Sequence, residues 1–305
     1  MLDKNHVYRM FRSIIEKGTV LTDESMSKHT SFKIGGPVDV FVMPGTIEEL
    51  ARSIKLCKNE GLKYFVMGNG SNLVIRDKGL RGVVIKISEK MSNIKVEGTR
   101  ITAEAGALLS VVSKVALRNS LSGLEFASGI PGSLGGAIAM NAGAYGGEMK
   151  DVVTKVLCLD TDGIFIEYEN KDMNFGYRQS RVQSENLIVV QVEMELKEGK
   201  YENIKAHMDE LTEKRTSKQP LNLPSAGSVF RRPEGHFAGK LIEDAGLKGL
   251  RLGDAQVSEK HSGFIVNVGN ATSDDVVNLI KVVQKTVSDK FGVELETEVK
   301  IMGEE

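Results

Sequence analysis

"SGIPGSLGGAIAMNAGAYGG", residues 128–147, is the stretch of this chain that most constrains its fold. The uncharged run to which it belongs begins at Phe126 and covers 22 residues, a length that could cross a bilayer. Seven glycines, a proline and few Leu, Ile or Val residues make it a poor membrane helix. Glycine lets a backbone approach a ligand closely. We therefore interpret the run as a buried loop system that holds a ligand.

A second glycine loop, "GNGSN" at 68–72, lies further towards the N-terminus. It begins like a dinucleotide-binding fingerprint, but Leu73 stands at the third glycine position and a strand follows where a helix should open. Its backbone N–H groups could converge on an anion such as a pyrophosphate, although a tight turn is an equally good interpretation. No Walker lysine follows either loop, which argues against a P-loop ATPase. Two such loops together favour a long, anionic ligand.

Periodicity around these loops predicts an α+β chain that begins with an α/β part. Thr46 and Glu49 form a capping box at the start of its helix, which Gly61 ends. The elements expected in this part are a strand over 38–43, a helix over 46–61, strands at the two ends of 63–75, and a strand over 81–87.

The remainder of the chain is richer in strands. A Ser273 cap and Gly292 delimit its last helix, and after it the sequence alternates apolar and polar residues as one strand. The elements expected here are hairpins over 94–106 and 155–168, a helix over 107–120, a buried strand over 186–196, helices over 201–220 and 273–292, and a strand over 293–302.

Composition narrows the class of function. Lys and Arg number 40 and Asp and Glu 41, for a net charge of -1, so the chain lacks the broad basic field of nucleic-acid binders. Cys57 and Cys158 lie far apart and outside any CxxC motif, so neither a disulfide nor a zinc site is expected, and Cys57 fits a core position. The five histidines lack metal-binding spacing. No signal peptide is evident, and we expect an intracellular protein.

Three polar residues are candidates for chemistry, although local sequence does not select them. Ser228 in "SAGSVF" lacks the G-x-S-x-G elbow of a hydrolase, which leaves a proton carrier and a turn residue as alternatives. Arg178 in "FGYRQS" is on spacing alone more simply a solvated arginine. Glu298 belongs to a polar strand face on which nothing distinguishes it from Glu296.

Seven segments, taken in order, resemble the UDP-N-acetylenolpyruvoylglucosamine reductase family over nearly the whole chain. They are "TSFKIGGP" (30–37), "GNGSNLVI" (68–75), "SGIPGSLGGAIAMNAGAYGGE" (128–148), "FGYRQS" (175–180), "SAGSVFRRP" (225–233), "AGKLIEDAGLKG" (238–249) and "ETEVKIMG" (296–303). The resemblance implies a cytoplasmic flavoenzyme of bacterial peptidoglycan synthesis. It would reduce UDP-N-acetylglucosamine enolpyruvate to UDP-N-acetylmuramate with FAD as cofactor and NADPH as co-substrate.

The resemblance also implies the fold and its division. The fold would be α+β: a two-subdomain FAD-binding fold of the vanillyl-alcohol oxidase type with a smaller α+β substrate-binding domain. The boundaries expected are 1–90 for the first FAD-binding subdomain, 91–218 for the second and 219–292 for the substrate domain. The C-terminal strand, 293–305, would join the first subdomain.

Site residues carry over from the same motifs. Arg178, Ser228 and Glu298 would be catalytic, with hydride from flavin N5, a proton from Ser228 and enolate stabilisation by Arg178. The candidates for FAD binding are Asn69, Gly70, Ser71, Asn72, Leu73, Ser128, Gly129, Ile130, Pro131, Gly132, Gly135, Gly136, Ala137, Asn141, Gly143, Ala144, Tyr145, Ile188 and Arg215. The candidates for substrate binding are Tyr177, Lys218, Arg232, Lys240 and His261.

One departure from the family concerns the nucleotide. A subgroup closes over UDP with a tyrosine on an extra loop, whereas this chain has no tyrosine after Tyr201 and resembles the shorter subgroup. The expected partner is a small UDP-sugar, with no nucleic acid, no membrane and a monomeric state. Two alternatives stay open: another FAD oxidoreductase of the same fold with a different substrate, and a non-catalytic nucleotide-binding module.

Overall fold

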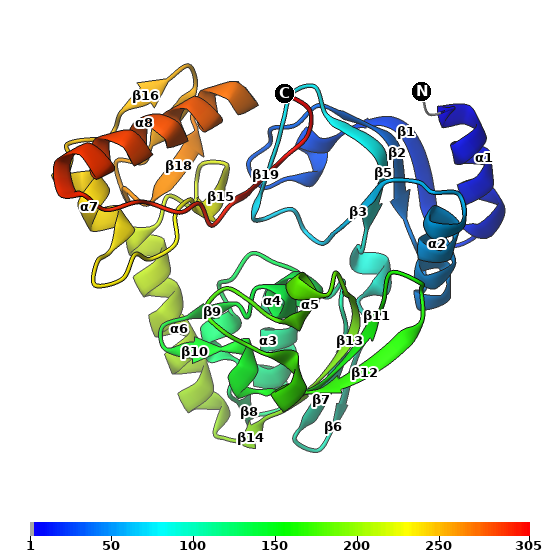
Figure 1. The fold of residues 1–305 in the computed structure, drawn as a ribbon. Helices are drawn as coiled ribbons and strands as arrows, with labels where there is room; N and C mark the ends of the chain where they lie inside the picture. The colour runs from blue at the N-terminus through cyan, green and yellow to red at the C-terminus, as the bar shows by residue number, and fades with distance from the viewer. Residues whose placement is uncertain (1–2) are drawn as a thin grey trace. The chain divides into compact units, whose positions relative to one another are not determined.

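The computed structural model describes residues 3–305 and falls into two compact units, each built from several chain segments (Figure 1). The first unit contains the chain up to Thr22 together with Val40–Asn69 and Gly82–Arg215. The second unit contains Asp23–Asp39, Gly70–Arg81 and Thr216–Glu305. The three-part boundaries expected from the sequence stay a prediction.

A four-stranded sheet of order β1-β2-β5-β3, with β3 and β5 parallel, lies mostly in the first unit. Its strands are β1 (Thr19–Ser25), β2 (Pro37–Met43), β3 (Tyr64–Met67) and β5 (Leu80–Lys86). Helices α1 (Lys4–Ile14) and α2 (Ile47–Asn59) pack on one another. Leu50, Ile54 and Cys57 on α2 are fully buried, which confirms Cys57 as a core residue.

The capping box predicted for α2 is half right. The Thr46 side chain accepts a hydrogen bond from the Glu49 N–H at 3.2 Å. Glu49 does not return the bond, because its carboxylate accepts from the backbone N–H groups of Gly45, Glu16 and Lys17 at 2.7, 2.8 and 2.7 Å. These bonds hold the pKa of Glu49 low against the opposing effect of burial.

A five-stranded antiparallel sheet of order β12-β11-β13-β7-β6 forms the rest of the first unit. Its strands are β6 (Ile94–Glu97), β7 (Arg100–Glu104), β11 (Val153–Leu159), β12 (Phe165–Glu169) and β13 (Ile188–Glu195). Both predicted hairpins and the long buried strand are therefore confirmed. The helices beside them are α3 (Leu109–Arg118), α5 (Arg181–Ser184) and α6 (Tyr201–Lys218), with β8 (Leu121–Ser122) and β14 (Lys197–Glu198) as a short pair.

The glycine-rich run is more ordered than the predicted loop system. It contains the helix α4 (Leu134–Ala139) and the paired strands β9 (Gly143–Ala144) and β10 (Gly147–Glu148). Leu134 and Ile138 are fully buried, and α4 packs against β13 and β7. Gly135 is required there because a Cβ would lie 2.9 Å from the Ala105 Cβ.

The largest sheet of the second unit is antiparallel, with the order β15-β18-β17-β16, and α8 packs on it. Its elements are β15 (Ser225–Ser228), α7 (Ala238–Asp244), β16 (Arg251–Leu252), β17 (Ala255–Val257), β18 (Phe264–Asn267) and α8 (Ser273–Phe291). The residue that caps α8 is Thr272 rather than Ser273, with Asp275 completing a capping box. Gly292 ends the helix at φ 66° as predicted.

The continuous strand predicted over 293–302 is wrong. Only β19 (Lys300–Met302) is a strand, and it pairs in parallel with β4 (Leu73–Ile75) of the same unit. Before it the chain makes a single bridge, from Thr297 to Phe230. Leu295 and Val299 are buried, so the alternation reflects burial of one face without a partner strand along its length.

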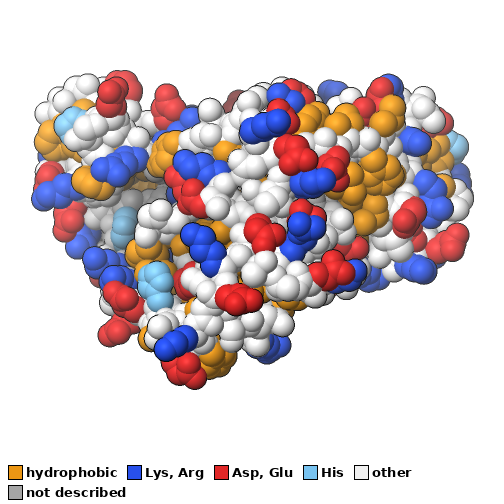
Figure 2. All heavy atoms as spheres, turned by 90° about the horizontal axis from the view of Figure 1, so that it is seen from below, with side chains coloured by type: hydrophobic (Ala, Val, Ile, Leu, Met, Phe, Trp, Pro, Cys, Tyr) orange, Lys and Arg blue, Asp and Glu red, His pale blue; other side chains and the backbone are white. Residues whose placement is uncertain are grey.

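The α+β prediction is confirmed by this mixture of packed helices and largely antiparallel sheets. On the face shown in Figure 2, acidic and basic side chains are interspersed, and no single sign dominates. Within residues 3–305, no helix is both long and apolar enough to cross a membrane. Cys57 and Cys158 are both buried as free thiols, and burial raises the pKa of each to about 12.

Candidate active site

Ser228 stands out from its strand because of a bulge. In the pairing of β15 with β18, Ser225 lies opposite Val266 and Ser228 opposite Phe264, so β15 contains one extra residue. Gly227 supplies the left-handed conformation that the bulge needs, at φ 76°. Val229 and Phe230 after it are buried, whereas Ser228 is exposed. The bulge thus presents a serine hydroxyl at the edge of a fixed core.

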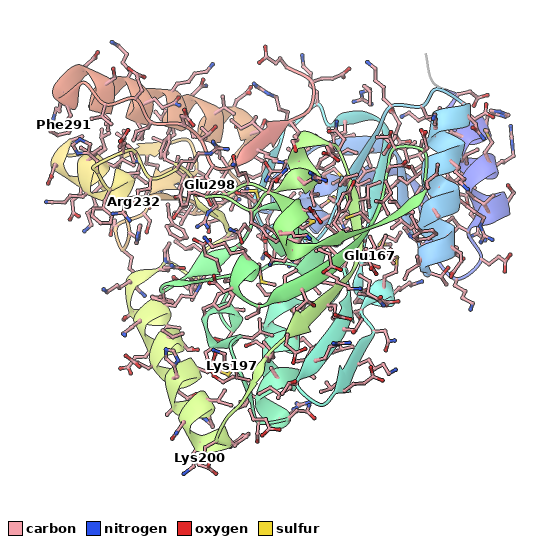
Figure 3. The ribbon with its side chains drawn as sticks, turned by 60° about the horizontal axis from the view of Figure 1, so that its bottom comes forward. Glu167, Lys197, Lys200, Arg232, Phe291 and Glu298 are labelled. Atoms are coloured by element: carbon pink, nitrogen blue, oxygen red, sulfur yellow. The ribbon has the colours of Figure 1, made fainter. Side chains whose placement is uncertain are left out.

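Glu298 is tied directly to this serine strand. Its N–H donates to the Val229 carbonyl at 2.7 Å, and its carbonyl accepts from the Asn72 side-chain amide at 3.1 Å. Glu298 is half-buried, while Glu296 is exposed and pairs with Arg231 at 3.3 Å. The structure therefore separates two glutamates that the sequence pattern left equivalent, and it brings the Glu298 backbone to Val229, the residue next to Ser228. Glu298 is labelled in Figure 3.

Arg178 lies in the first unit on a loop with an unusual backbone. Its φ is 56°, a left-handed conformation that costs a non-glycine residue about 1–2 kcal/mol. The Gln183 side-chain amide donates to the Arg178 carbonyl at 3.2 Å and to the Ala139 carbonyl at 2.6 Å. The Ser180 hydroxyl also donates to Ala139, at 3.0 Å. Side chains from α5 and its cap therefore fix the conformation that presents Arg178.

Asn141 anchors the same loop from the glycine-rich run. Its buried amide donates to Glu148 at 2.9 Å and to the Gly176 carbonyl at 3.1 Å, while its oxygen accepts from the Lys150 N–H at 3.0 Å. The hydrogen bond from the Lys150 ammonium lowers the pKa of Glu148, and Asn141 and the charge of Arg178 add to this. The Asn141 side chain is therefore engaged with protein, although the sequence placed it among the cofactor contacts.

The two glycine loops pack closely against their surroundings. A Cβ on Gly68 would collide with the Ser133 hydroxyl at the start of α4. Gly70, at φ 66°, lies against the His29 carbonyl, and its own carbonyl accepts from the Ser31 N–H at 3.1 Å. Asn69, in the loop between β3 and β4, is exposed, whereas Gly70 after it is buried.

Arg215, near the end of α6, is half-buried and has one buried nitrogen that lacks a partner within residues 3–305. Its Nε is buried and has no hydrogen-bond partner among the described residues. A Cβ on Gly129 would lie 2.8 Å from the Arg215 Cδ, so the guanidinium lies against the beginning of the glycine-rich run. Burial lowers the pKa of Arg215, partly offset by Tyr145. An anion is the partner that such a group lacks.

The residues expected to bind substrate are distributed over both units. Tyr177 is 54% exposed beside Arg178, whose guanidinium lies 5.2 Å from its ring centre. In the second unit, Lys218, Arg232 and Lys240 are exposed, and Lys240 pairs with Asp244 at 2.6 Å. Nothing in these contacts assigns a ligand to any of them.

His261 is the fifth of these residues, and it adjoins the serine strand. Its ring makes an edge contact with Phe264, the residue opposite Ser228, at a centroid distance of 5.0 Å. Its Nδ1 accepts from the Gly263 N–H at 3.1 Å. Burial lowers the pKa of His261, which favours the neutral ring that this bond requires.

Two features of the site were not predicted from the sequence. The sequence around Gln183 does not show that its side chain supports the Arg178 loop, and the sequence around Gly227 does not show that the strand bulges there. A left-handed non-glycine residue such as Arg178 has no reliable sequence signal either. No cluster of three His, Cys, Asp or Glu side chains that could bind a metal occurs in the described chain, residues 3–305.

Comparison with known proteins gives two matching family models. Residues 219–302 match the UDP-N-acetylenolpyruvoylglucosamine reductase C-terminal domain, and residues 38–169 match an FAD binding domain. The first covers the elements from β15 to β19. The second covers the elements from β2 to β12, including both glycine loops.

Curated relatives match over the full length. The chain is 55% identical to the UDP-N-acetylenolpyruvoylglucosamine reductase of Alkaliphilus oremlandii over 304 residues, which is 100% of both chains. The reductase of Clostridioides difficile is 51% identical, again over 100% of both. The solved structure of the reductase from Thermus caldophilus superposes with a TM-score of 0.81 at 36% identity, covering 94% of this chain and 99% of that one. The chain therefore belongs to the UDP-N-acetylenolpyruvoylglucosamine reductase family.

Proposed function

We propose that Arg178, Ser228 and Glu298 perform the acid and electrostatic chemistry of this reductase. The protein reduces UDP-N-acetylenolpyruvoylglucosamine and uses FAD to do so, in keeping with the family and its FAD binding domain. The observation that supports the proposal is the backbone hydrogen bond from the Glu298 N–H to the Val229 carbonyl, which joins Glu298 to the residue that follows an exposed serine on a bulged strand. We further propose that NADPH is the reductant.

The residues present fit an FAD cofactor. Its diphosphate is an anion, and the buried Nε of Arg215 has no partner among residues 3–305. The loops at 68–72 and 128–147 offer glycine backbone that a large ligand can approach. We propose that these loops, Ile188 and Arg215 hold the cofactor. When bound, FAD supplies the hydride transfer from NADPH to the methylene carbon of the enol ether.

The protein's own groups handle the charge and the proton. Hydride addition at the methylene carbon leaves negative charge on the neighbouring carbon and its carboxylate. Gln183 holds the Arg178 backbone through its carbonyl before substrate arrives, and the guanidinium presented by that backbone would stabilise the charge with little reorganisation. The Ser228 hydroxyl would then donate its proton to this carbon, which completes the saturated lactyl ether.

The remaining roles follow from the substrate's charge. Lys218, Arg232 and Lys240 would bind its diphosphate and carboxylate, while Tyr177 and His261 would donate neutral hydrogen bonds. His261 suits this role because its Nδ1 accepts a backbone bond, so the proton lies on Nε2. We propose a monomer that works in the cytoplasm on a small UDP-sugar, without nucleic-acid partners.

The test separates the two half-reactions. Ser228→Ala should leave flavin reduction by NADPH intact but slow flavin reoxidation by the enolpyruvyl substrate by about 100-fold or more, the low end for a general acid. Ser225→Ala, on the same strand, is the control and should slow neither step. Equal loss in both half-reactions would remove Ser228 from the proton-donor role.

The same experiment distinguishes the alternatives. Purified protein should have a flavin spectrum that bleaches with NADPH and returns on adding the enolpyruvyl substrate. Another FAD oxidoreductase would bleach without returning, and a nucleotide-binding module would not bleach at all. Arg178→Lys keeps the charge but loses the planar fork, so its reoxidation step should also slow.

A further inference from the structure

Phe237 is exposed in a unit that buries most of its other aromatic rings. Its side chain is 61% exposed, the largest exposure of any large hydrophobic residue in the described chain. Phe230, two residues after β15, and Phe264, on β18, are each 4% exposed. Phe237 precedes the first turn of α7, where its carbonyl accepts from the Lys240 and Leu241 N–H groups at 3.0 and 3.1 Å. The ring is therefore held out by a fixed backbone.

A guanidinium covers one face of this ring. The Arg232 Cζ lies 4.0 Å from the ring centre of Phe237, well within the range of a cation–π contact. The segment between them turns back through a bond from the His236 N–H to the Pro233 carbonyl at 3.2 Å, with Gly235 at φ 71°. A ring that is so covered and still 61% exposed has its other face open.

The open ring and the serine belong to one corner of the second unit. Ser228 pairs with Phe264, and the Phe264 ring contacts His261. The His261 ring in turn packs on Gly239, where a Cβ would lie 3.3 Å from its Cε1. Gly239 is two residues after Phe237. A chain of direct contacts therefore links the serine to the exposed aromatic ring.

Other aromatic residues of this unit do not offer the same combination. The chain has no tryptophan and no tyrosine after Tyr201, and Phe32 is fully buried. Phe291 is 41% exposed at the end of α8, next to the helix cap Gly292. Figure 3 labels it at the end of this helix and labels Arg232 on the segment that follows Ser228. Only Phe237, within residues 23–39, 70–81 and 216–305, combines exposure with a stacked cation.

We propose that Phe237 and Arg232 form the subsite for the uracil end of the substrate. This inference rests on the proposed function. The open face of Phe237 stacks on the pyrimidine ring, and the Arg232 guanidinium at the ring's other face adds positive charge for the adjoining diphosphate. A planar, weakly polar base followed by two phosphates matches an aromatic surface backed by a cation.

The probe is UDP itself, titrated calorimetrically into FAD-loaded protein. Phe237→Ala should weaken UDP binding about tenfold and raise KM for the enolpyruvyl substrate by a similar factor, since base–aromatic stacking is lost. The kcat should stay within about twofold, because the ring does not touch the reacting carbon. Phe237→Tyr should restore the affinity, because it keeps the ring.

Phe291→Ala is the matched control and should bind UDP as the wild type does. Unchanged UDP affinity in Phe237→Ala would overturn the inference, as would an increase in KM confined to NADPH. If the wild type bound UDP with this dependence on Phe237 but did not turn over the enolpyruvyl substrate, the proposed function would fail while the subsite would stand.

Discussion

Gln183→Leu tests whether the Gln183 side chain holds the Arg178 loop in the conformation that the proposed reaction requires. Leucine keeps the size of the side chain but cannot donate to the Arg178 and Ala139 carbonyls, which accept at 3.2 and 2.6 Å. Each such bond contributes about 0.5–1.5 kcal/mol. We therefore expect the free energy of unfolding to fall by about 1–3 kcal/mol.

The effect on catalysis comes from the bond to Arg178 alone. Losing about 1 kcal/mol of support lets a residue that itself pays about 1–2 kcal/mol for φ 56° leave the left-handed region. The step that needs Arg178 should then slow by about 5- to 30-fold, the factor that corresponds to 1–2 kcal/mol. Flavin reduction by NADPH should not change, because it does not involve the enolpyruvyl group.

The assay is stopped-flow reoxidation of the reduced enzyme by the enolpyruvyl substrate, with Ser184→Ala on the same helix as control. A double-mutant cycle with Arg178→Lys shows whether Gln183 acts through the arginine. In that background Gln183→Leu should cause little further loss in rate. Full additivity of the two rate losses would refute a role of Gln183 in positioning Arg178.

Three further predictions concern the serine bulge, the buried histidine and the cysteines. A Cβ at Gly227 would meet no atom within 4 Å, so Gly227→Ala should lower the free energy of unfolding by about 1–2 kcal/mol through backbone strain alone. Gly98→Ala, equally open at φ 59°, is the control and should lower it by as much in denaturant unfolding. Only Gly227→Ala should also slow turnover. Burial lowers the pKa of His261, so its contribution to the free energy of unfolding is complete above about pH 6.5 and is lost as the pH falls. The Tm of His261→Asn should therefore fall less than that of the wild type between pH 7.5 and 5. An identical dependence of Tm on pH in the two proteins would contradict this. With each pKa at about 12, Cys57 and Cys158 should react with a thiol reagent at pH 8 only in denaturant, and rapid labelling of native protein would disprove their burial.

The local sequence was sufficient to predict an element where a single turn or cap residue determines it. Hairpins such as the one around Gly163 follow from alternation on both sides of a turn residue, and Gly292 ended its helix as expected. Helix starts were less certain, because Thr272 and Ser273 are both good caps and only the backbone shows which one accepts the bond.

Tertiary contacts decided what the sequence could not. The alternation over 293–302 describes which side chains are buried, but a strand needs a neighbour paired over several residues, and apart from the single bridge at Thr297 only β19 has one. Glycine in 128–147 lowers helix propensity, yet burial of Leu134 and Ile138 stabilises α4. For the same reason nothing in the pattern separated Glu298 from Glu296, since the difference lies in a bond to Val229, a residue distant in sequence.

The parallel pairing of β19 with β4 also bears on how the protein is made. Residues 23–39 and 70–81 leave the ribosome early, but their unit is complete only when the last strand reaches Leu73–Ile75. Contacts of such long sequence separation close slowly and leave a strand edge open in the meantime. A nascent chain must therefore carry an unfinished second unit through most of its synthesis, and Ser228 gains Glu298 near its strand among the last events of folding.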